Sequence, residues 1–380
     1  MIFLFFLYLS RNYLKLRAMK KITFLFLNFL LFGSFFSCKT DNAGEIKEAI
    51  HFDTTYLSCD QGMETAILLN DTLYVFSPRV SSSLGQSDTV QKMYCFNKQG
   101  EKLFEIVLDS LFHNYYYLFP ANNQLYASVR LNNEDATLRF DPSLHKWIPA
   151  EGVKPAPLFE DENYIVTSSS SGEWGGTIFF TSKQDGKTYE GASLSPIQVV
   201  KKDGVYYISN ALEHMSGHST ICAIEDPLKM AVFKNDRPTA DSLIHLREST
   251  STQGLKMIAD YGAYKKPTGQ FTEPAGDTVY VMQPAMLLSS FIHKNDLYYM
   301  YADTAVHIFR INPTSESTVT DIQDPRVEIL YTFTTPMSAS PWLKYSQTNY
   351  HQLFFLTGEG GAIMEVVPDA IYLHTLVNKK

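Results

Sequence analysis

Cysteine and tryptophan are scarce in this 380-residue sequence, which has four cysteines and three tryptophans. The cysteines include no CxxC pair and no Cys/His spacing of the kind that binds zinc, and they are too few for a disulfide scaffold of this length. A GxSxG motif, a phosphate-binding loop and a GxGxxG after a strand-like segment are also missing. We therefore expect no metal and no cofactor, and we assign no catalytic residue.

Basic residues are in deficit after the N-terminal segment. Residues 1–37 contain five Lys and Arg and no acid, which leaves 27 Lys and Arg against 40 Asp and Glu, a net charge of −13, for the rest of the chain. No cluster of Lys and Arg interrupts this acidic background. Because such a surface repels phosphate backbones, we expect no nucleic-acid partner.

Aromatic residues, in contrast, are abundant. Phe, Tyr and Trp make up 14% of the sequence, within a hydrophobic content of 45%. Aromatic side chains pack well on the half-buried surface of a pleated sheet, and this composition excludes disorder for most of the chain. The composition therefore favours an all-β protein.

A short apolar segment lies near the N-terminus. Met19-Lys20-Lys21 precedes an apolar run from Ile22 to Phe36 that is interrupted by Thr23, Asn28, Gly33 and Ser34. This run is short for a bilayer span, which takes about 20 residues. A basic start followed by a short apolar run is typical of a signal peptide, so we interpret residues 1–37 as one, with Met19 as the true start.

Phe35-Phe36-Ser37-Cys38 ends this run and places a small residue before a cysteine. The segment resembles the signal peptides of bacterial lipoproteins, with Phe35 where Leu is common, as in the relaxed lipoboxes of Bacteroidota. The resemblance implies lipidation (palmitate) of Cys38, a tether over residues 38–50, and attachment to the outer membrane on its periplasmic or outer face. A simple secretory signal and an uncleaved membrane anchor are the alternatives.

Polar turns recur through residues 51–380, and each follows an apolar stretch. Their anchors lie 44, 41, 43, 40, 47 and 56 residues apart. The turns are Phe96-NKQGE, Phe140-DPSLHK, Thr181-SKQDGK, Ile224-EDPLK, Tyr264-KKPTGQ, Ile311-NPTSES and Val367-PDA. A period of 40 to 50 residues with about four strands per unit predicts a β-propeller.

A second set of turns precedes short aromatic strands, in phase with the first set. Examples are Asn70-Asp71 before LYVF, Asn122-Asn123 before LYASV and Asp203-Gly204 before VYYIS. The stretch from 235 to 290 has no clean copy, and Gly276-Asp277 is out of phase. We predict about seven four-stranded blades, with six blades and an irregular insertion as the competing count. In this architecture and in its leader, the chain resembles the uncharacterised propeller lipoproteins of Bacteroidota, which implies only a fold and a compartment.

Long polar connections alternate with these tight turns, at residues 77–91, 130–136, 168–176 and 209–219. In a four-stranded blade such connections project from one face, where binding residues concentrate. For any single loop, the alternative is a solvated segment without a ligand. The candidate ligand-binding residues in or beside such connections are Arg79, Arg130, Glu134, Trp174, Glu213, His214, His218, Tyr301 and Asp303.

The candidates suit different contacts. An exposed Trp174 would stack on a sugar ring or grip a partner, or else it folds back onto the core. Arg79 and Arg130 would bind a carboxylate, unless they are solvated or ion-paired. Gly217 between His214 and His218 argues against a helical metal pair, which leaves a polar ligand contact or hydrogen-bonded loop histidines.

Three functions are compatible with these features. The leading one is a non-catalytic binding propeller in the cell envelope, with an unknown carbohydrate or envelope protein as partner. The second is a glycoside-cleaving propeller, which needs two carboxylates about 5 to 10 Å apart. The sequence offers Glu134, Glu213, Glu273 and Asp303 for that role. The third is a structural scaffold for envelope complexes.

Overall fold

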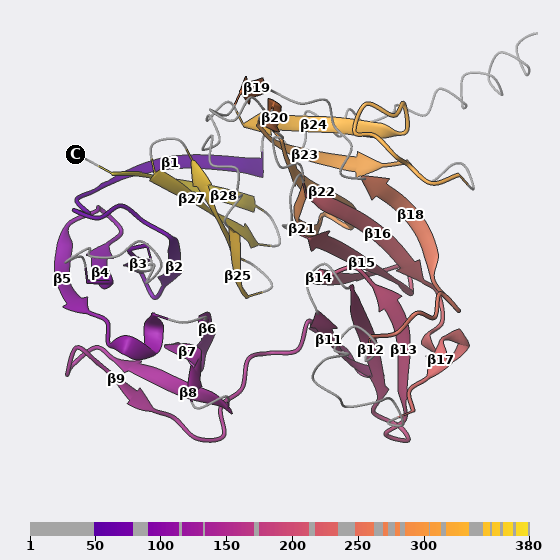
Figure 1. Cartoon of the computed structure of the whole chain (residues 1–380), viewed down its shortest axis with the longest axis horizontal. Helices are drawn as coiled ribbons and strands as arrows, with labels where there is room; N and C mark the ends of the chain where they lie inside the picture. Colours follow the sequence, from indigo (N-terminus) through magenta and orange to yellow (C-terminus); the bar gives the residue numbers. More distant parts are fainter. Residues whose placement is uncertain are drawn as a thin grey trace, which may run out of the picture. The chain divides into compact units, whose positions relative to one another are not determined.

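Six sheets of four or five strands, antiparallel except for one strand pair, make up most of the computed structural model (Figure 1). The expected all-β propeller is therefore confirmed, with six blades in the described part of the chain, which is the competing count. The structure describes residues 49–78, 90–113, 116–131, 134–170, 175–212, 217–234, 248–261, 269–272, 278–281, 286–303, 305–312, 317–333, 345–349, 352–357, 360–367 and 370–378.

Consecutive strands A, B, C and D build each of the first three blades. Blade 1 contains β2 (Thr65–Leu69), β3 (Thr72–Phe76), β4 (Lys92–Asn97) and β5 (Lys102–Val107). The 3-10 helix η2 (Ser110–Phe112) leads to blade 2, with β6 (Tyr116–Ala121), β7 (Gln124–Leu131), β8 (Glu134–Asp141) and β9 (Lys146–Pro149). Blade 3 contains β10 (Phe159–Glu160), β11 (Tyr164–Ser170), β12 (Gly176–Ser182) and β13 (Thr188–Ser193), and β17 (Ala231–Val232) joins it at its outer side.

The last three blades follow the same order. Blade 4 contains β14 (Pro196–Lys202), β15 (Val205–Leu212), β16 (His218–Ile224) and, after the 3-10 helix η4 (Pro227–Lys229), β18 (Lys256–Tyr261). Blade 5 contains β21 (Met286–His293), β22 (Asp296–Ala302), β23 (Val306–Ile311) and β24 (Val327–Phe333). Blade 6 contains β25 (Tyr345–Asn349), β26 (Gln352–Thr357), β27 (Gly360–Val367) and β28 (Ala370–Asn378).

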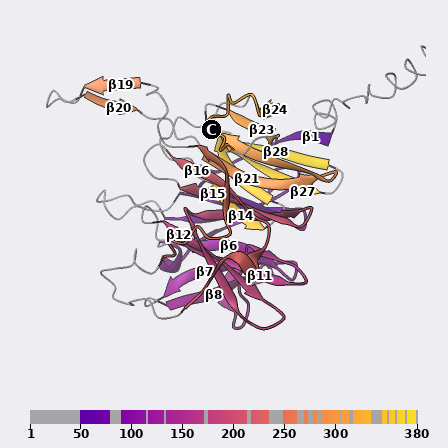
Figure 2. The ribbon, with the colours of Figure 1, turned by 90° about the vertical axis from the view of Figure 1, so that its right-hand side faces the viewer.

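The first described strand completes the last blade. Strand β1 (Ile50–Leu57) pairs in parallel with β28, from Ile50 opposite Ile371 to Leu57 opposite Asn378. Figure 2 shows β1 beside β28. The described domain is thus closed by pairing between its two ends.

Tight A–B turns explain why the aromatic strands begin where they do. Both central residues have positive φ in the turns Asn70-Asp71, Asn122-Asn123 and Asp203-Gly204. Two consecutive positive φ angles define the type I′ turn, whose twist matches that of the strands on either side. Asn, Asp and Gly tolerate this conformation best, so the local sequence dictates these hairpins.

The C–D turns explain the difference between seven and six blades. Of the seven turns in the sequence repeat, six follow a C strand. Five of them lead directly to the D strand of the same blade, and the turn at Ile224 leads through η4 and β17 to β18. The turn at Tyr264 follows β18, the D strand of blade 4, and its first residues lie outside the described ranges. It leads to a separate hairpin of β19 (Gly269–Thr272) and β20 (Thr278–Val281). The segment between β18 and β21, which contains this hairpin, is therefore an insertion rather than a blade.

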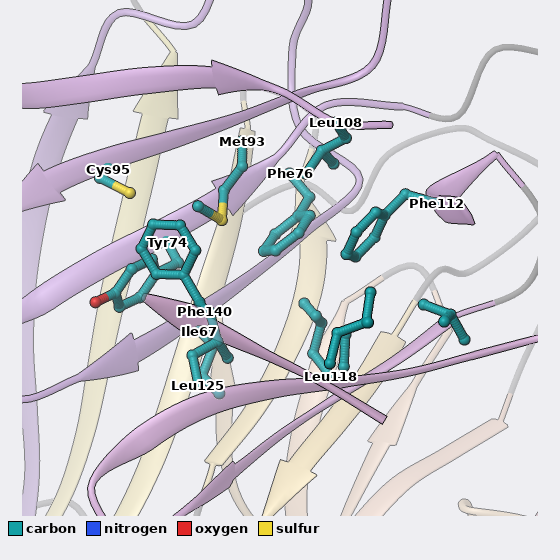
Figure 3. Packing of buried hydrophobic residues seen from close by; sticks show 13 residues of the cluster. Ile67, Tyr74, Phe76, Met93, Cys95, Leu108, Phe112, Leu118, Leu125 and Phe140 are labelled. Carbon is teal, nitrogen blue, oxygen red and sulfur yellow. The ribbon is translucent and has the colours of Figure 1, made fainter. Parts of the chain in front are cut away.

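The core lies largely between neighbouring blades. Figure 3 shows one cluster, in which Phe76 of blade 1 faces Phe112 and the side chain of Leu118 from blade 2. Other clusters join blades 6 and 1, blades 3 and 4, and blades 4 and 5. Inner strands such as β4 and β21 are buried on both faces, so they read as apolar runs rather than strict alternations.

The strand order divides the ends of the blades into two edges. The A–B and C–D turns lie at one end of the strands, which we call the turn edge. The B–C connections and the links between blades lie at the other end, which we call the loop edge. This division follows from the antiparallel order of the strands in each blade.

Candidate functional site at the loop edge

The four connections that the sequence singles out all join a B strand to a C strand. They connect β3 to β4, β7 to β8, β11 to β12 and β15 to β16, so they share the loop edge. The prediction of a long connection at 130–136 is wrong, because β7 extends to Leu131 and β8 begins at Glu134, which pairs with it. Whether the connections bind a ligand stays a prediction. The structure describes the strand ends that carry them, and those ends show which of the segments come together.

Blades 3 and 4 bring two of these segments together. The Ser170 hydroxyl, at the end of β11, lies 3.3 Å from the Ser195 hydroxyl, which precedes β14. The Ser193 hydroxyl donates to the carbonyl oxygen of the Asn210 side chain, near the end of β15. The segments 168–176 and 209–219 are therefore connected through residues 193–195.

Asn210 stands out among these residues because its side chain is buried and only partly satisfied. It is 0% exposed, and within the described part of the chain its amide nitrogen has no hydrogen-bond partner. A buried polar group without a partner costs about 1–3 kcal/mol, so such groups are rare in folded proteins.

A buried carboxylate lies at the same edge of blade 3. Glu248 is 8% exposed, and its Oε2 accepts hydrogen bonds from the hydroxyls of Ser169 at 2.7 Å and Thr177 at 2.6 Å. The Thr177 hydroxyl also accepts the backbone N–H of Ser249 at 2.7 Å. These bonds hold residues 248–249 against the ends of β11 and β12.

Glu248 and Asn210 are not among the residues predicted from the sequence. Glu248 lies in the stretch from 235 to 290, where the turn repeat has no clean copy, so no sequence signal marked it. Asn210 lies inside the predicted segment 209–219. The sequence identified this segment, but it could not show that the Asn210 side chain is buried.

His218, at the start of β16, is the described member of the predicted histidine pair. Its Nε2 lies 2.8 Å from Asp260 Oδ1 on β18, the neighbouring strand. His218 is thus a hydrogen-bonded strand residue at the loop edge of blade 4, and whether it also contacts a ligand stays a prediction. Among the described residues, no group of three His, Cys, Asp or Glu is arranged to hold a metal ion.

Tyr301 and Asp303 lie at the end of β22 in blade 5. Tyr301 is 1% exposed and packs in the core against Tyr261 and Phe309, so its surroundings are those of a packing residue. Asp303 accepts the backbone N–H of Ala305 at 3.1 Å and lies 3.1 Å from Nε2 of His307. Asp303 therefore orders the connection between β22 and β23.

The remaining candidates are described in part or not at all. Arg130 is exposed near the end of β7, which agrees with either a solvated or a ligand-binding arginine. Glu134 begins β8, but its side chain is not described. Four candidates lie outside the described residues, namely Arg79, Trp174, Glu213 and His214. Their roles stay predictions.

Comparison with known protein families finds no matching family model, and comparison with curated proteins finds no match. Solved structures give weak matches. The Dos1 propeller matches with 8% identity and a TM-score of 0.30, covering 83% of this chain and 71% of that one. A GH43 β-xylosidase/α-arabinofuranosidase from a compost metagenome matches with 10% identity and a TM-score of 0.30, covering 68% and 94%.

The sialidase of Trypanosoma rangeli matches with 8% identity and a TM-score of 0.31, covering 82% of this chain and 53% of that one. At such scores we draw no conclusion about activity from any of the three proteins. The sheets and strand order of this chain themselves support the propeller fold.

Proposed function

We propose that this chain is a lipid-anchored envelope protein whose propeller binds a hydroxyl-rich ligand, of the carbohydrate class, at the loop edge without cleaving it. The observation that carries this proposal is the polar cluster of blades 3 and 4. There, hydroxyls, a buried amide and a buried carboxylate lie beneath two of the long connections. Hydroxyl and amide side chains both donate and accept hydrogen bonds, and a carboxylate accepts them, as ligand hydroxyls require.

Trp174 belongs to the predicted connection between β11 and β12, and the ends of these two strands carry part of this cluster. An indole at a sugar site stacks on the ring, while the polar groups below bind its hydroxyls. We therefore expect glycan binding to depend on both. A glycan array probed with the purified full chain tests this, with Trp174→Ala and Ser170→Ala as site variants and Gln99→Ala, in a turn-edge loop, as the matched control.

Loss of glycan binding in the two site variants, with the control unchanged, would support the proposal. An array without any binding, combined with a protein captured reproducibly from the envelope, would replace the carbohydrate with a protein partner. Binding that survives both site variants but fails in variants of residues 97–101 would place the ligand at the turn edge instead.

We infer a non-catalytic site because the described carboxylates of this edge are hydrogen-bonded to other side chains of the protein. Glu248 accepts two hydroxyls, Asp260 is bonded to His218, and Asp303 lies beside His307. Each of these carboxylates therefore already has a partner within the chain. Hydrolysis of chromogenic glycosides by the purified chain, abolished in one carboxylate variant, would overturn this part in favour of a glycosidase.

The anchor is tested separately at Cys38. Mass spectrometry of the protein purified from membranes should show a lipidated N-terminus at this residue, and Cys38→Ala should release a soluble or unprocessed form. An unmodified terminus at another residue would contradict the anchor. Among the described residues, no helix is long and apolar enough to cross a membrane.

A further inference from the structure

Strand β1 is added to a blade that is already complete. Blade 6 takes four strands, β25 to β28, from the C-terminal part of the chain, and β1 pairs with β28 as a fifth strand that runs parallel to it. A propeller blade ordinarily consists of four strands. The sheet of blade 6 therefore does not need β1 in order to form.

Most side chains of β1 lie outside the core. Of its eight residues, only Ile50 and Leu57, at the two ends, are buried, and five are exposed. Phe52 is 54% exposed, although its ring touches that of Tyr331 in blade 5, with centroids 5.7 Å apart. The segment between the two ends therefore buries little apolar surface and depends mainly on backbone pairing and polar contacts.

The contacts that join blades 6 and 1 include a set that begins at the very end of β1. The backbone N–H of Cys59 donates to Asn378 Oδ1 at 2.9 Å, and Asn378 Nδ2 donates to the backbone oxygen of Cys59 at 2.8 Å. Leu57 and Cys59 also belong to the buried cluster that contains Ile363 and Leu376 of blade 6. These contacts can hold the two blades together when residues 50–56 separate from β28.

A charged cluster holds the middle of β1. Nδ1 of His374, on β28, lies 2.8 Å from both carboxylate oxygens of Asp53. Nε2 of His374 lies 3.9 Å from the carboxylate of Glu365, on β27. The ring of Tyr372 stacks beside the imidazole, with centroids 6.1 Å apart. His374 is thus the group that connects β1 to the charged side chains of blade 6.

Blade 1 contributes one cation to this cluster. Lys98, in the turn between β4 and β5, is paired with Asp71 and also acts on Glu365 and Asp53. The Glu365 carboxylate and, to a smaller extent, Asp53 raise the pKa of His374, while partial burial acts against them. The attraction between His374 and Asp53 is therefore fully present below pH 6.5 and is lost as the pH rises through the raised pKa.

We propose that residues 50–56 form a pH-sensitive strap, which is held on blade 6 while His374 is protonated and opens as a unit, with the propeller still closed, when His374 is neutral. Opening uncovers the outer edge of β28, and free N–H and C=O groups at a strand edge can pair with another extended segment. The strap depends neither on the proposed lipid anchor nor on the proposed ligand.

Hydrogen–deuterium exchange of the full chain, followed by mass spectrometry at pH 6 and pH 9, tests the strap. Exchange is expressed as protection relative to unstructured peptides, because the intrinsic exchange rate itself rises with pH. Peptides that cover 50–57 report on the strap, and peptides that cover β27 report on the closed propeller. The variants are Asp53→Asn and His374→Gln. The matched control is His51→Gln, on the same face of β1, where the histidine stacks on Tyr372.

We expect residues 50–56 to be less protected than β27 at both pH values, since a local opening needs less free energy than global unfolding. Their protection should fall several-fold from pH 6 to pH 9, while that of β27 stays constant. Asp53→Asn and His374→Gln should show the weaker protection already at pH 6 and lose the pH dependence. His51→Gln should retain the pH dependence.

Three results would overturn the strap. Equal protection of residues 50–56 and β27 would show that β1 opens only when the whole domain unfolds. A joint loss of protection at pH 9 would show that the propeller cannot stay closed without β1. A pH dependence that persists in Asp53→Asn and His374→Gln would show that the His374 contact is not the switch.

Discussion

His374 on β28 lies 2.8 Å from Asp53 on β1, so a polar contact joins the two strands that close the domain. The Glu365 carboxylate and, to a smaller extent, the Asp53 carboxylate hold the pKa of His374 above its usual value of 6.5. Partial burial acts in the opposite direction. Lys98 is the nearby cation that acts on Glu365. The charged form of His374 therefore stabilises the closing strand pair.

This contact predicts a pH dependence of stability. A histidine whose pKa is raised on folding contributes its full stabilisation below pH 6.5 and loses it as the pH rises through the folded value. Urea unfolding should therefore show a larger difference between the parent protein and His374→Gln at pH 6 than at pH 9. His113→Gln, at an exposed histidine, should show no such trend. A pH-independent difference would mean that His374 acts by packing alone.

Gly100 should be essential for the close packing of β1 against blade 1. It has a φ of +82°, and a Cβ at this position would collide with the backbone oxygen of Tyr56 on β1. Gly62 has a similar φ of +77° but open space around the same position. Both Gly→Ala changes carry backbone strain of about 1 kcal/mol, so Gly100→Ala should lower the melting temperature further than Gly62→Ala. Equal decreases in melting temperature for the two variants would show that β1 can move away from residue 100 without a cost in stability.

Asp161 should link blades 3 and 4 at the turn edge. Burial opposes its ionisation, but hydrogen bonds from Lys201 and Tyr206, each at 2.7 Å, and from the backbone outweigh it and lower the pKa of Asp161 to about 2. Asp161→Asn should cost about 1–3 kcal/mol at neutral pH, while the exposed Asp203→Asn should cost little. Because a lowered carboxyl pKa stabilises only above its unfolded value, the Asp161→Asn difference should shrink as the pH falls from 4 to 2.

Glu248 should contribute to the stability of the loop edge itself. Removing its carboxylate leaves the Ser169 and Thr177 hydroxyls without their acceptor, so Glu248→Ala should lower the free energy of unfolding by about 1–3 kcal/mol. Glu225→Ala, at an exposed glutamate, is the control. Indistinguishable stabilities for the two variants would show that residues 248–249 are held by other contacts.

The three cysteines of the described chain should be unreactive in the folded protein. Cys59, Cys95 and Cys222 are free and buried. Burial raises the pKa of Cys59 to about 12 and of Cys222 to about 11, which keeps both as thiols at neutral pH. A thiol reagent should therefore react with these three thiols only after the protein is unfolded. The total number of reactive thiols after unfolding should be three when Cys38 is lipidated and four when it is not. Rapid reaction of three thiols in the native protein would contradict this burial.

Much of the blade architecture could be predicted from the sequence because it is local. The pairs Asn70-Asp71 and Asn122-Asn123 adopt the positive φ angles of a type I′ turn, so each hairpin is encoded within a few residues. The blade number was less certain, since the turn at Tyr264 has the same composition as the true C–D turns. Only the strand pairing shows that it follows a completed blade.

The candidate site was predictable as a set of segments but not as a set of contacts. Alternation of turns placed 168–176 and 209–219 at one edge, and the structure connects them through Ser193 and Asn210. Glu248 was beyond prediction, because its hydroxyl partners lie more than 70 residues away along the chain. A buried carboxylate and an exposed one look alike in a sequence.

The amino-acid sequence by itself determined the hairpins, the strand class and the edge at which each connection lies, since turn chemistry acts over two to four residues. Tertiary structure alone decided how the domain closes, because the pairing of Ile50 with Ile371 depends on the geometry of all the intervening blades. It also decided which apolar side chains remain exposed. Exposure depends on the neighbouring blade, which no local pattern specifies.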